Sequence, residues 1–124
     1  MMKNKMMEVL TEYIYEWSKE RGLNNGEPSK QLNKLLEEVG ELASGLNKNN
    51  RELIVDSIGD VYVTLVVLSQ QLGLEIEDCV QQAYHEIRGR KGKMIGGIFV
   101  KEEDMKGEVE EDERKNKSNK VEIS

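Results

Sequence analysis

Acidic residues recur in two short segments that share one pattern. Residues 37–42 and 56–61 both read acid, any residue, apolar residue, glycine, acid, apolar residue. Residues three or four apart share one face of a helix, so the acids of each segment should converge. The five acids concerned are Glu37, Glu38, Glu41, Asp56 and Asp60. Because like charges at this spacing repel one another, the pattern predicts a cation held between two neighbouring helices.

The chemistry of these side chains favours Mg²⁺, with Mn²⁺ as an alternative ion. Mg²⁺ prefers oxygen ligands in octahedral geometry and leaves positions for water and substrate phosphate. Gly40 and Gly59 each cost about 1 kcal/mol relative to alanine inside a helix, and we expect them to let the two backbones approach closely. The alternative for residues 37–41 is a solvated acidic face. The metal is favoured because Asp56 and Asp60 adjoin an apolar helix, where ionisable groups are usually paired or metal-bound.

Helices must position these acids. Apolar residues at steps of three and four predict an all-α bundle of four to five helices, four of them over residues 3–21, 28–46, 50–71 and 76–88. Pro28 suits a first helical turn, and Asn49 with Glu52 resembles a capping pair. The residues that we expect these helices to bury are Met6, Leu10, Tyr13, Ile14, Trp17, Leu32, Leu35, Leu36, Val39, Leu42, Ala43, Leu46, Ile76, Val80, Ala83, Tyr84 and Ile87.

Residues 61–68, VYVTLVVL, are rich in β-branched side chains and have strand propensity. The apolar pattern extends back to Leu53 without a turn signal before Gly73, which is too long for a typical strand, so it predicts a buried helix. Such a helix needs cover on several sides, which predicts a homo-oligomer, either a dimer or a tetramer. Residues 95–98, Ile-Gly-Gly-Ile, predict either a small hairpin or an ordered arm.

The length and charge of the chain limit its domain organisation and its possible partners. The chain has 124 residues, with 24 acidic and 18 basic side chains and a net charge of −6, which argues against binding nucleic acid or an anionic membrane. We expect one helical domain over residues 1–100 and a disordered, charged tail over residues 101–124. Cys79 and His85 are too few for a structural zinc site, so Cys79 should fill the core and His85 should lie at the surface. With no long apolar run and no signal-peptide pattern, the sequence predicts a cytoplasmic protein.

The segment Glu37-Glu38-x-x-Glu41, followed some fifteen residues later by an acidic pair, resembles the EExxE and ExxD signature of the MazG-like all-α nucleoside triphosphate pyrophosphohydrolases. The resemblance extends from about Glu12 to Met94, which is most of the chain before the predicted tail. It implies a helical, oligomeric enzyme that uses Mg²⁺ to hydrolyse a nucleoside triphosphate to the monophosphate and pyrophosphate.

The resemblance also implies roles for single residues. Glu38, Glu41 and Asp60 match the metal-binding acids, and Glu37 is a further ligand or the base for the attacking water. The first acid of ExxD falls at Ser57, so Asp56 is our candidate for the missing ligand. The catalytic candidates are therefore Glu37 and Glu38, and the metal candidates are Glu38, Glu41, Asp56 and Asp60.

Five further residues are candidates for substrate binding. The resemblance implies that Arg88, Arg90 and Lys91 bind the triphosphate. The alternative role for these cations is to complement the dipole at the C-terminus of a helix. Lys34 is either a partner of Glu38 within its helix or a phosphate ligand. Trp17 packs in the core or stacks on the base.

Three functions remain open at this point. The first is pyrophosphohydrolysis of a deoxyribonucleotide or a non-standard nucleotide. The second is the related phosphoribosyl-ATP pyrophosphohydrolase activity. The third is a non-catalytic dimerisation or adaptor protein whose acids bind a basic partner. Turnover of a nucleotide distinguishes the first two from the third.

Overall fold

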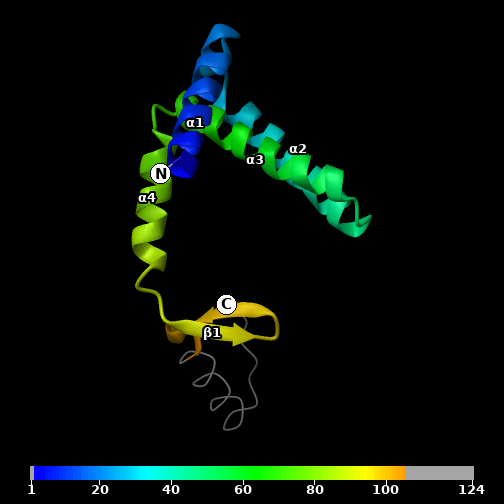
Figure 1. Ribbon diagram of the computed structural model, residues 1–124, viewed down its shortest axis with the longest axis vertical. Helices are drawn as coiled ribbons and strands as arrows, with labels where there is room; N and C mark the ends of the chain where they lie inside the picture. The colour runs from blue at the N-terminus through cyan, green and yellow to red at the C-terminus, as the bar shows by residue number, and fades with distance from the viewer. Residues whose placement is uncertain (1, 106–124) are drawn as a thin grey trace. The chain divides into compact units, whose positions relative to one another are not determined.

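The computed structural model describes residues 2–105 and confirms the all-α fold class (Figure 1). The helices are α1 (Met2–Glu20), the short 3-10 helix η1 (Leu23–Asn25), α2 (Pro28–Asn47), α3 (Arg51–Gln71) and α4 (Ile76–Ile87), followed by strands β1 (Gly92–Ile95) and β2 (Ile98–Lys101). The chain divides into two compact units, residues 1–80 and 81–124, and each is described by itself. None of the helices within residues 2–105 has both the length and the apolar character needed to cross a bilayer.

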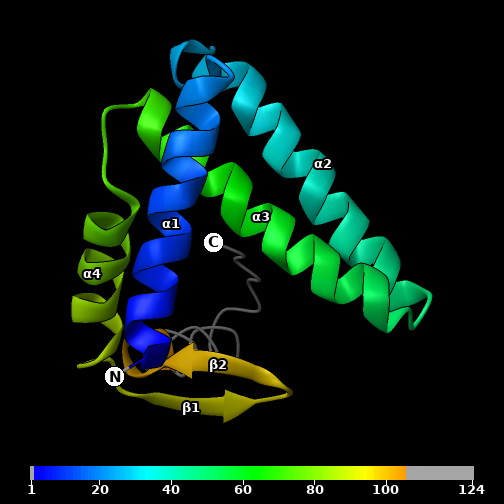
Figure 2. The ribbon, with the colours of Figure 1, turned by 45° about the horizontal axis from the view of Figure 1, so that its top comes forward.

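Helices α2 and α3 form an antiparallel hairpin, and they lie side by side in both ribbon views (Figures 1 and 2). Pro28 begins α2, as predicted. The predicted cap of α3 is wrong by one residue, because the Asn50 side chain accepts the Leu53 N–H at 3.1 Å while Asn49 has a left-handed φ of 54° in the turn. The two helix backbones approach at Gly45, which is buried against Leu53 and Ile54.

The predicted role of Gly40 and Gly59 is therefore wrong. A Cβ atom on either residue would meet no heavy atom within 4 Å, so neither glycine is needed for close packing. Gly45 has this role instead, because a Cβ atom there would lie 3.2 Å from the Ile54 backbone nitrogen.

Helix α1 packs on α3 through small and hydroxyl-bearing side chains. Thr11 Oγ1 lies 2.8 Å from Tyr62 Oη, Tyr15 Oη lies 3.3 Å from Ser69 Oγ, and Gln70 Nε2 donates to the Tyr15 carbonyl at 3.1 Å. Thr11 and Ser18 are buried. The expected burial of the apolar stripe of α1 is wrong for its members Met6, Leu10, Tyr13 and Trp17, which are 42–60% exposed, whereas Ile14 is half-buried.

The apolar core of residues 2–105 is small. It is centred on Val66 and Val67 of α3, with Ile76 at the start of α4. Other apolar residues that we expected to be buried are exposed; they are Leu32, Leu36, Val39, Ala43, Leu46, Val80, Ala83, Tyr84 and Ile87. Leu35 and Leu42 are half-buried. Cys79 is exposed, so its assignment to the core is wrong, and His85 is exposed as predicted. Helices α1 and α2 both pack on α3, but much of the apolar stripe of each stays exposed to solvent.

The predicted hairpin is confirmed. Strands β1 and β2 pair antiparallel with Ile95 opposite Ile98. Gly96 and Gly97 have φ values of 59° and 81°, which a two-residue turn of this kind requires and which glycine adopts at no steric cost. Strand β2 includes Lys101, the first residue of the segment predicted as a tail. From residue 106 onward, that predicted tail lies outside the described residues.

Candidate active site

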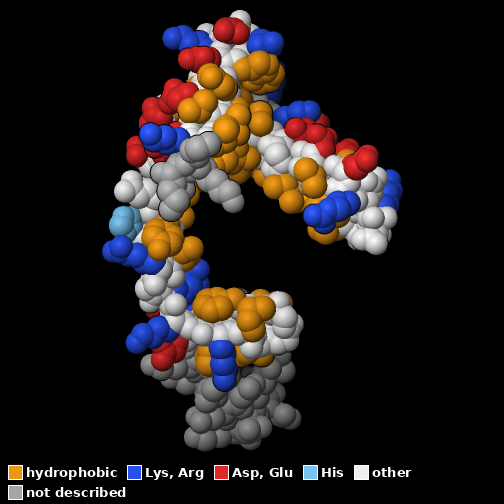
Figure 3. Space-filling model, in the orientation of Figure 1, with side chains coloured by type: hydrophobic (Ala, Val, Ile, Leu, Met, Phe, Trp, Pro, Cys, Tyr) orange, Lys and Arg blue, Asp and Glu red, His pale blue; other side chains and the backbone are white. Residues whose placement is uncertain are grey.

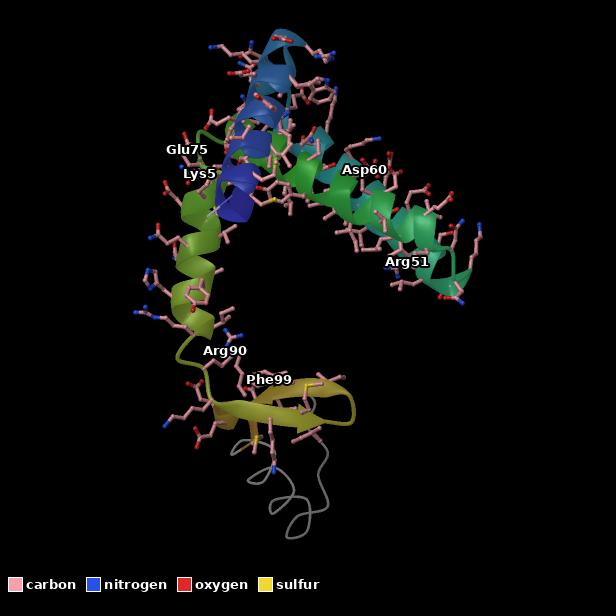
Figure 4. All side chains as sticks on the ribbon, in the orientation of Figure 1. Lys5, Arg51, Asp60, Glu75, Arg90 and Phe99 are labelled. Atoms are coloured by element: carbon pink, nitrogen blue, oxygen red, sulfur yellow. The ribbon has the colours of Figure 1, made fainter. Side chains whose placement is uncertain are left out.

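A cleft of about 580 Å³ opens among α1, η1, α2 and α3 in the first unit. Four of the predicted site residues line it, namely Trp17, Lys34, Glu38 and Asp60. Their elements are α1, α2 and α3, and the α2–α3 hairpin brings the two acidic segments together. Asp60 is labelled along α3 in Figure 4. The cleft thus combines an aromatic ring, an ammonium group and two carboxylates.

Glu38 is the least exposed of the three acids in residues 37–41. Its side chain is 14% exposed, against 71% for Glu37. Lys34 precedes Glu38 by one helical turn, and its Nζ lies 3.2 Å from Glu38 Oε1 and 3.7 Å from Glu37 Oε2. The Glu38 and Glu37 charges raise the pKa of Lys34, first through the hydrogen bond with Glu38.

Asp60 is a half-buried acid in contact with Glu38. Its pKa is raised above the ordinary value of 3.8, first by burial, then by the charges of Asp56 and Glu38, and also by a hydrogen bond with Glu38. The Lys34 ammonium opposes this rise. The charge of Glu38 therefore disfavours ionisation of Asp60 in the cleft that both residues line.

The remaining predicted acids lie farther out. Glu37, Glu41 and Asp56 are exposed, and none of them lines the cleft. Ser57 is buried, at 1% exposed, so the position that the resemblance assigns to an acid faces the interior of the unit. Asp56 is close enough for its charge to raise the pKa of Asp60. Within residues 2–105, no three acidic, histidine or cysteine side chains are grouped closely enough to enclose an ion.

Two carboxylates are nevertheless sufficient for one class of metal site. Mg²⁺ dehydrates reluctantly and is usually bound by one or two carboxylates plus water and substrate phosphates. The Glu38 and Asp60 oxygens are hard donors in contact with each other, and their mutual repulsion would be relieved by a cation. The residues present fit an Mg²⁺ ion that arrives with a nucleotide.

The predicted phosphate-binding residues Arg88, Arg90 and Lys91 belong to the second unit. Arg90 and Lys91 line a separate hollow of about 440 Å³, together with Lys101 of β2 and three glutamates. Their role in substrate binding stays a prediction.

Several residues of the cleft were not predicted from the sequence. Gln31 of α2 donates from Nε2 to the Thr64 carbonyl of α3 at 3.2 Å, and Lys30 lies beside it. Gln71 donates to the Leu23 carbonyl at 2.9 Å, while its buried Oε1 has no hydrogen-bond partner among the described residues. The signal for Gln31 was available, because Gln31, Lys34 and Glu38 follow one another at steps of three and four along one helix face.

A second, apolar hollow of about 890 Å³ lies between α1 and α3. It shares Asp60 with the cleft, as well as Trp17 and Val63. Trp17 is 42% exposed, and the Arg21 guanidinium stands 4.8 Å from its ring centroid. The ring therefore borders both hollows instead of packing in the core.

Residues 27–95 match the family model of the MazG nucleotide pyrophosphohydrolase domain. This range includes the α2–α3 hairpin with Lys34, Glu38 and Asp60. The chain belongs to the MazG family. It is also 44% identical over 66 residues to an uncharacterized 18.2 kDa protein in the rep-hol intergenic region of Haemophilus phage HP1. That match covers 52% of this chain and 40% of the phage protein. No solved structure matches the chain.

The raised pKa of Asp60 leads to a prediction about the stability of this MazG domain. The folded state holds the Asp60 proton more tightly than the unfolded state. Protonation of Asp60 therefore contributes to the free energy of unfolding, fully below pH 3.8, and this contribution is lost as the pH rises through the raised pKa. At pH 7 and without divalent metal, Asp60→Asn should raise the melting temperature by about 1–4 °C. Thermal melts in EDTA across pH 3–8 would test this. If Asp60→Asn still melted at a higher temperature than the unaltered protein below pH 3.8, the ionised Asp60 would not be the cause of the difference.

Proposed function

We propose that this MazG domain hydrolyses a nucleoside triphosphate, either a deoxyribonucleotide or a non-standard nucleotide, to the monophosphate and pyrophosphate with Mg²⁺. The observation that carries the proposal is that Glu38 of α2 and Asp60 of α3 line one cleft together with Trp17 and Lys34. The MazG match supports the reaction class.

In this proposal Glu38 and Asp60 would hold the metal ion. The ligand roles of Asp56, in place of the acid missing at Ser57, and of Glu41 stay predictions from the resemblance, because both residues are exposed outside the cleft. The bound ion supplies neutralisation of the phosphate charge and a lower pKa for the attacking water. Glu37, which is exposed and lies 3.7 Å from Lys34, would accept a proton from that water. Trp17 stacks on the base, because its exposed ring borders the cleft.

A panel of ribo- and deoxyribonucleoside triphosphates tests the proposal. With Mg²⁺, at least one nucleotide should yield the monophosphate and pyrophosphate in equal amounts, and EDTA should abolish the reaction. Phosphoribosyl-ATP belongs in the same panel, since a preference for it would assign the related activity. No turnover across the panel would favour an adaptor.

We also propose that the domain assembles as a homodimer or homotetramer. Hydrophobic side chains gather over α1 and along the α2–α3 hairpin (Figure 3), and the hollow between α1 and α3 is lined mainly by apolar residues. Apolar patches of this kind on a soluble protein usually mark an interaction surface. Light scattering after gel filtration should therefore give a mass of two or four times 14.2 kDa.

A pair of variants tests this surface. Leu10 lines the hollow, whereas Leu74, in the loop after α3, is equally apolar and 51% exposed outside it. Leu10→Glu should lower the mass to that of one chain, and Leu74→Glu should leave it unchanged. A single-chain mass for the unaltered protein would contradict the proposal.

A further inference from the structure

The Lys34 ammonium occupies the space in front of the Glu38 carboxylate. Nζ lies 3.2 Å from Glu38 Oε1 and 3.7 Å from Glu37 Oε2, and its charge also acts on Asp60. A single cationic group thus offsets acids of both α2 and α3. It stands at one of the two carboxylate oxygens through which Glu38 could bind a metal ion.

Two cations cannot occupy that position together. Mg²⁺ binds carboxylate oxygen at about 2.0–2.1 Å, so an ammonium that stays in contact with the same oxygen would face a doubly charged ion at close range. Metal binding through Oε1 therefore requires Lys34 to move, and binding through Oε2 brings the ion close enough for the ammonium to repel it.

The contacts of Lys34 allow such a movement. Its side chain is 56% exposed, and lysine carries its charge on a flexible four-carbon stem. The lysine also precedes the glutamate in the helix, which is the less favourable order for a pair four residues apart. The lysine side of this pair is exposed although Glu38 is not, so the ammonium can leave the carboxylate without disturbing the packing around Glu38.

The Lys34 side chain lines the cleft in which a bound nucleotide would lie. Lys34 lines it together with Lys30 and Gln31, which extend the same face of α2 toward its N-terminus. A phosphate group of a nucleotide held by Glu38 and Asp60 through a metal would lie within this cleft.

We propose that Lys34 is a displaceable counter-ion. It neutralises Glu38 and Glu37 while no metal is bound, and it transfers its ammonium to a substrate phosphate when the divalent cation takes its place. This inference rests on the proposed function. It adds that Lys34 opposes binding of the metal alone and favours binding of the metal–nucleotide complex.

The test measures binding of Mn²⁺ by electron paramagnetic resonance, first alone and then with a non-hydrolysable nucleoside triphosphate analogue. The variants are Lys34→Met and, as a matched control, Lys30→Met. Lys30 lies one turn earlier on α2, lines the same cleft and is paired with Glu27 at 3.7 Å, away from the two acids. Circular dichroism checks that both variants keep their helix content.

For Lys34→Met we expect Mn²⁺ alone to bind about two- to five-fold more tightly, and the nucleotide analogue with Mn²⁺ to bind more weakly. Lys30→Met should change the affinity for Mn²⁺ alone much less. Affinity for Mn²⁺ alone that is unchanged or lower in Lys34→Met, or raised equally by Lys30→Met, would overturn the counter-ion while leaving the proposed function intact. Failure of the unaltered protein to bind Mn²⁺, with or without nucleotide, would overturn both.

Discussion

Replacing Glu38 with glutamine should lower the rate of nucleoside triphosphate hydrolysis by about 100- to 1,000-fold, the effect of removing one well-placed electrostatic contact in an active site. Glutamine has nearly the same shape, but it lacks the charge that would hold a divalent cation beside Asp60. The measurement is the initial rate of pyrophosphate release at saturating Mg²⁺.

A control for this variant is available on α1. Glu16 is exposed and does not line the cleft, so Glu16→Gln removes the same charge without touching the site and should retain the rate. The fluorescence of Trp17, the single tryptophan of the chain, provides a separate readout of nucleotide binding. If Glu38→Gln hydrolysed nucleotides as fast as Glu16→Gln, Glu38 would not be part of the catalytic site.

Enlarging Gly45 should destabilise the packing of α2 on α3. The residue is buried, and a Cβ atom would lie 3.2 Å from both the backbone nitrogen and Cγ1 of Ile54. Gly45→Val adds two further methyl groups to this contact, so the α2–α3 hairpin must open or distort. Overpacking of this kind costs about 1–3 kcal/mol, which urea denaturation monitored by circular dichroism would measure.

Gly40 provides the opposite result in the same helix. It is exposed, and a Cβ atom there would meet nothing within 4 Å. Gly40→Ala should therefore stabilise the domain by about 0.5–1 kcal/mol through the better helix propensity of alanine. Equal destabilisation by Gly45→Val and Gly40→Ala would show that glycine at these positions serves something other than the approach of α2 and α3.

Local sequence signals predicted the helices and the hairpin well. Periodic apolar residues set the four long helices to within a few residues, Pro28 marked the start of α2, and the two glycines after Ile95 marked the turn between the strands. These signals succeed because they act within one turn of helix or one pair of strands. The cap of α3 was misplaced by one residue, since Asn49 and Asn50 are chemically alike and only the backbone decides which of them caps.

Burial was predicted poorly, for a physical reason. An apolar stripe shows that a helix can bury one face, but it does not say which partner covers it. In α1 the covered face carries Thr11 and Ser18, while Trp17 remains 42% exposed beside the cleft. The stripe that we assigned to a core is instead the face that we propose as an interface between subunits.

By itself, the sequence determined that five acids lie on two neighbouring helices, because three- and four-residue spacing fixes the face of a helix. Only the tertiary structure decided that Glu38 and Asp60 line the cleft while Glu37, Glu41 and Asp56 stay exposed, and that Ser57 is buried. The rotation of α2 and α3 about their own axes depends on long-range packing at Gly45, Gln31 and Thr64, which helical periodicity does not record.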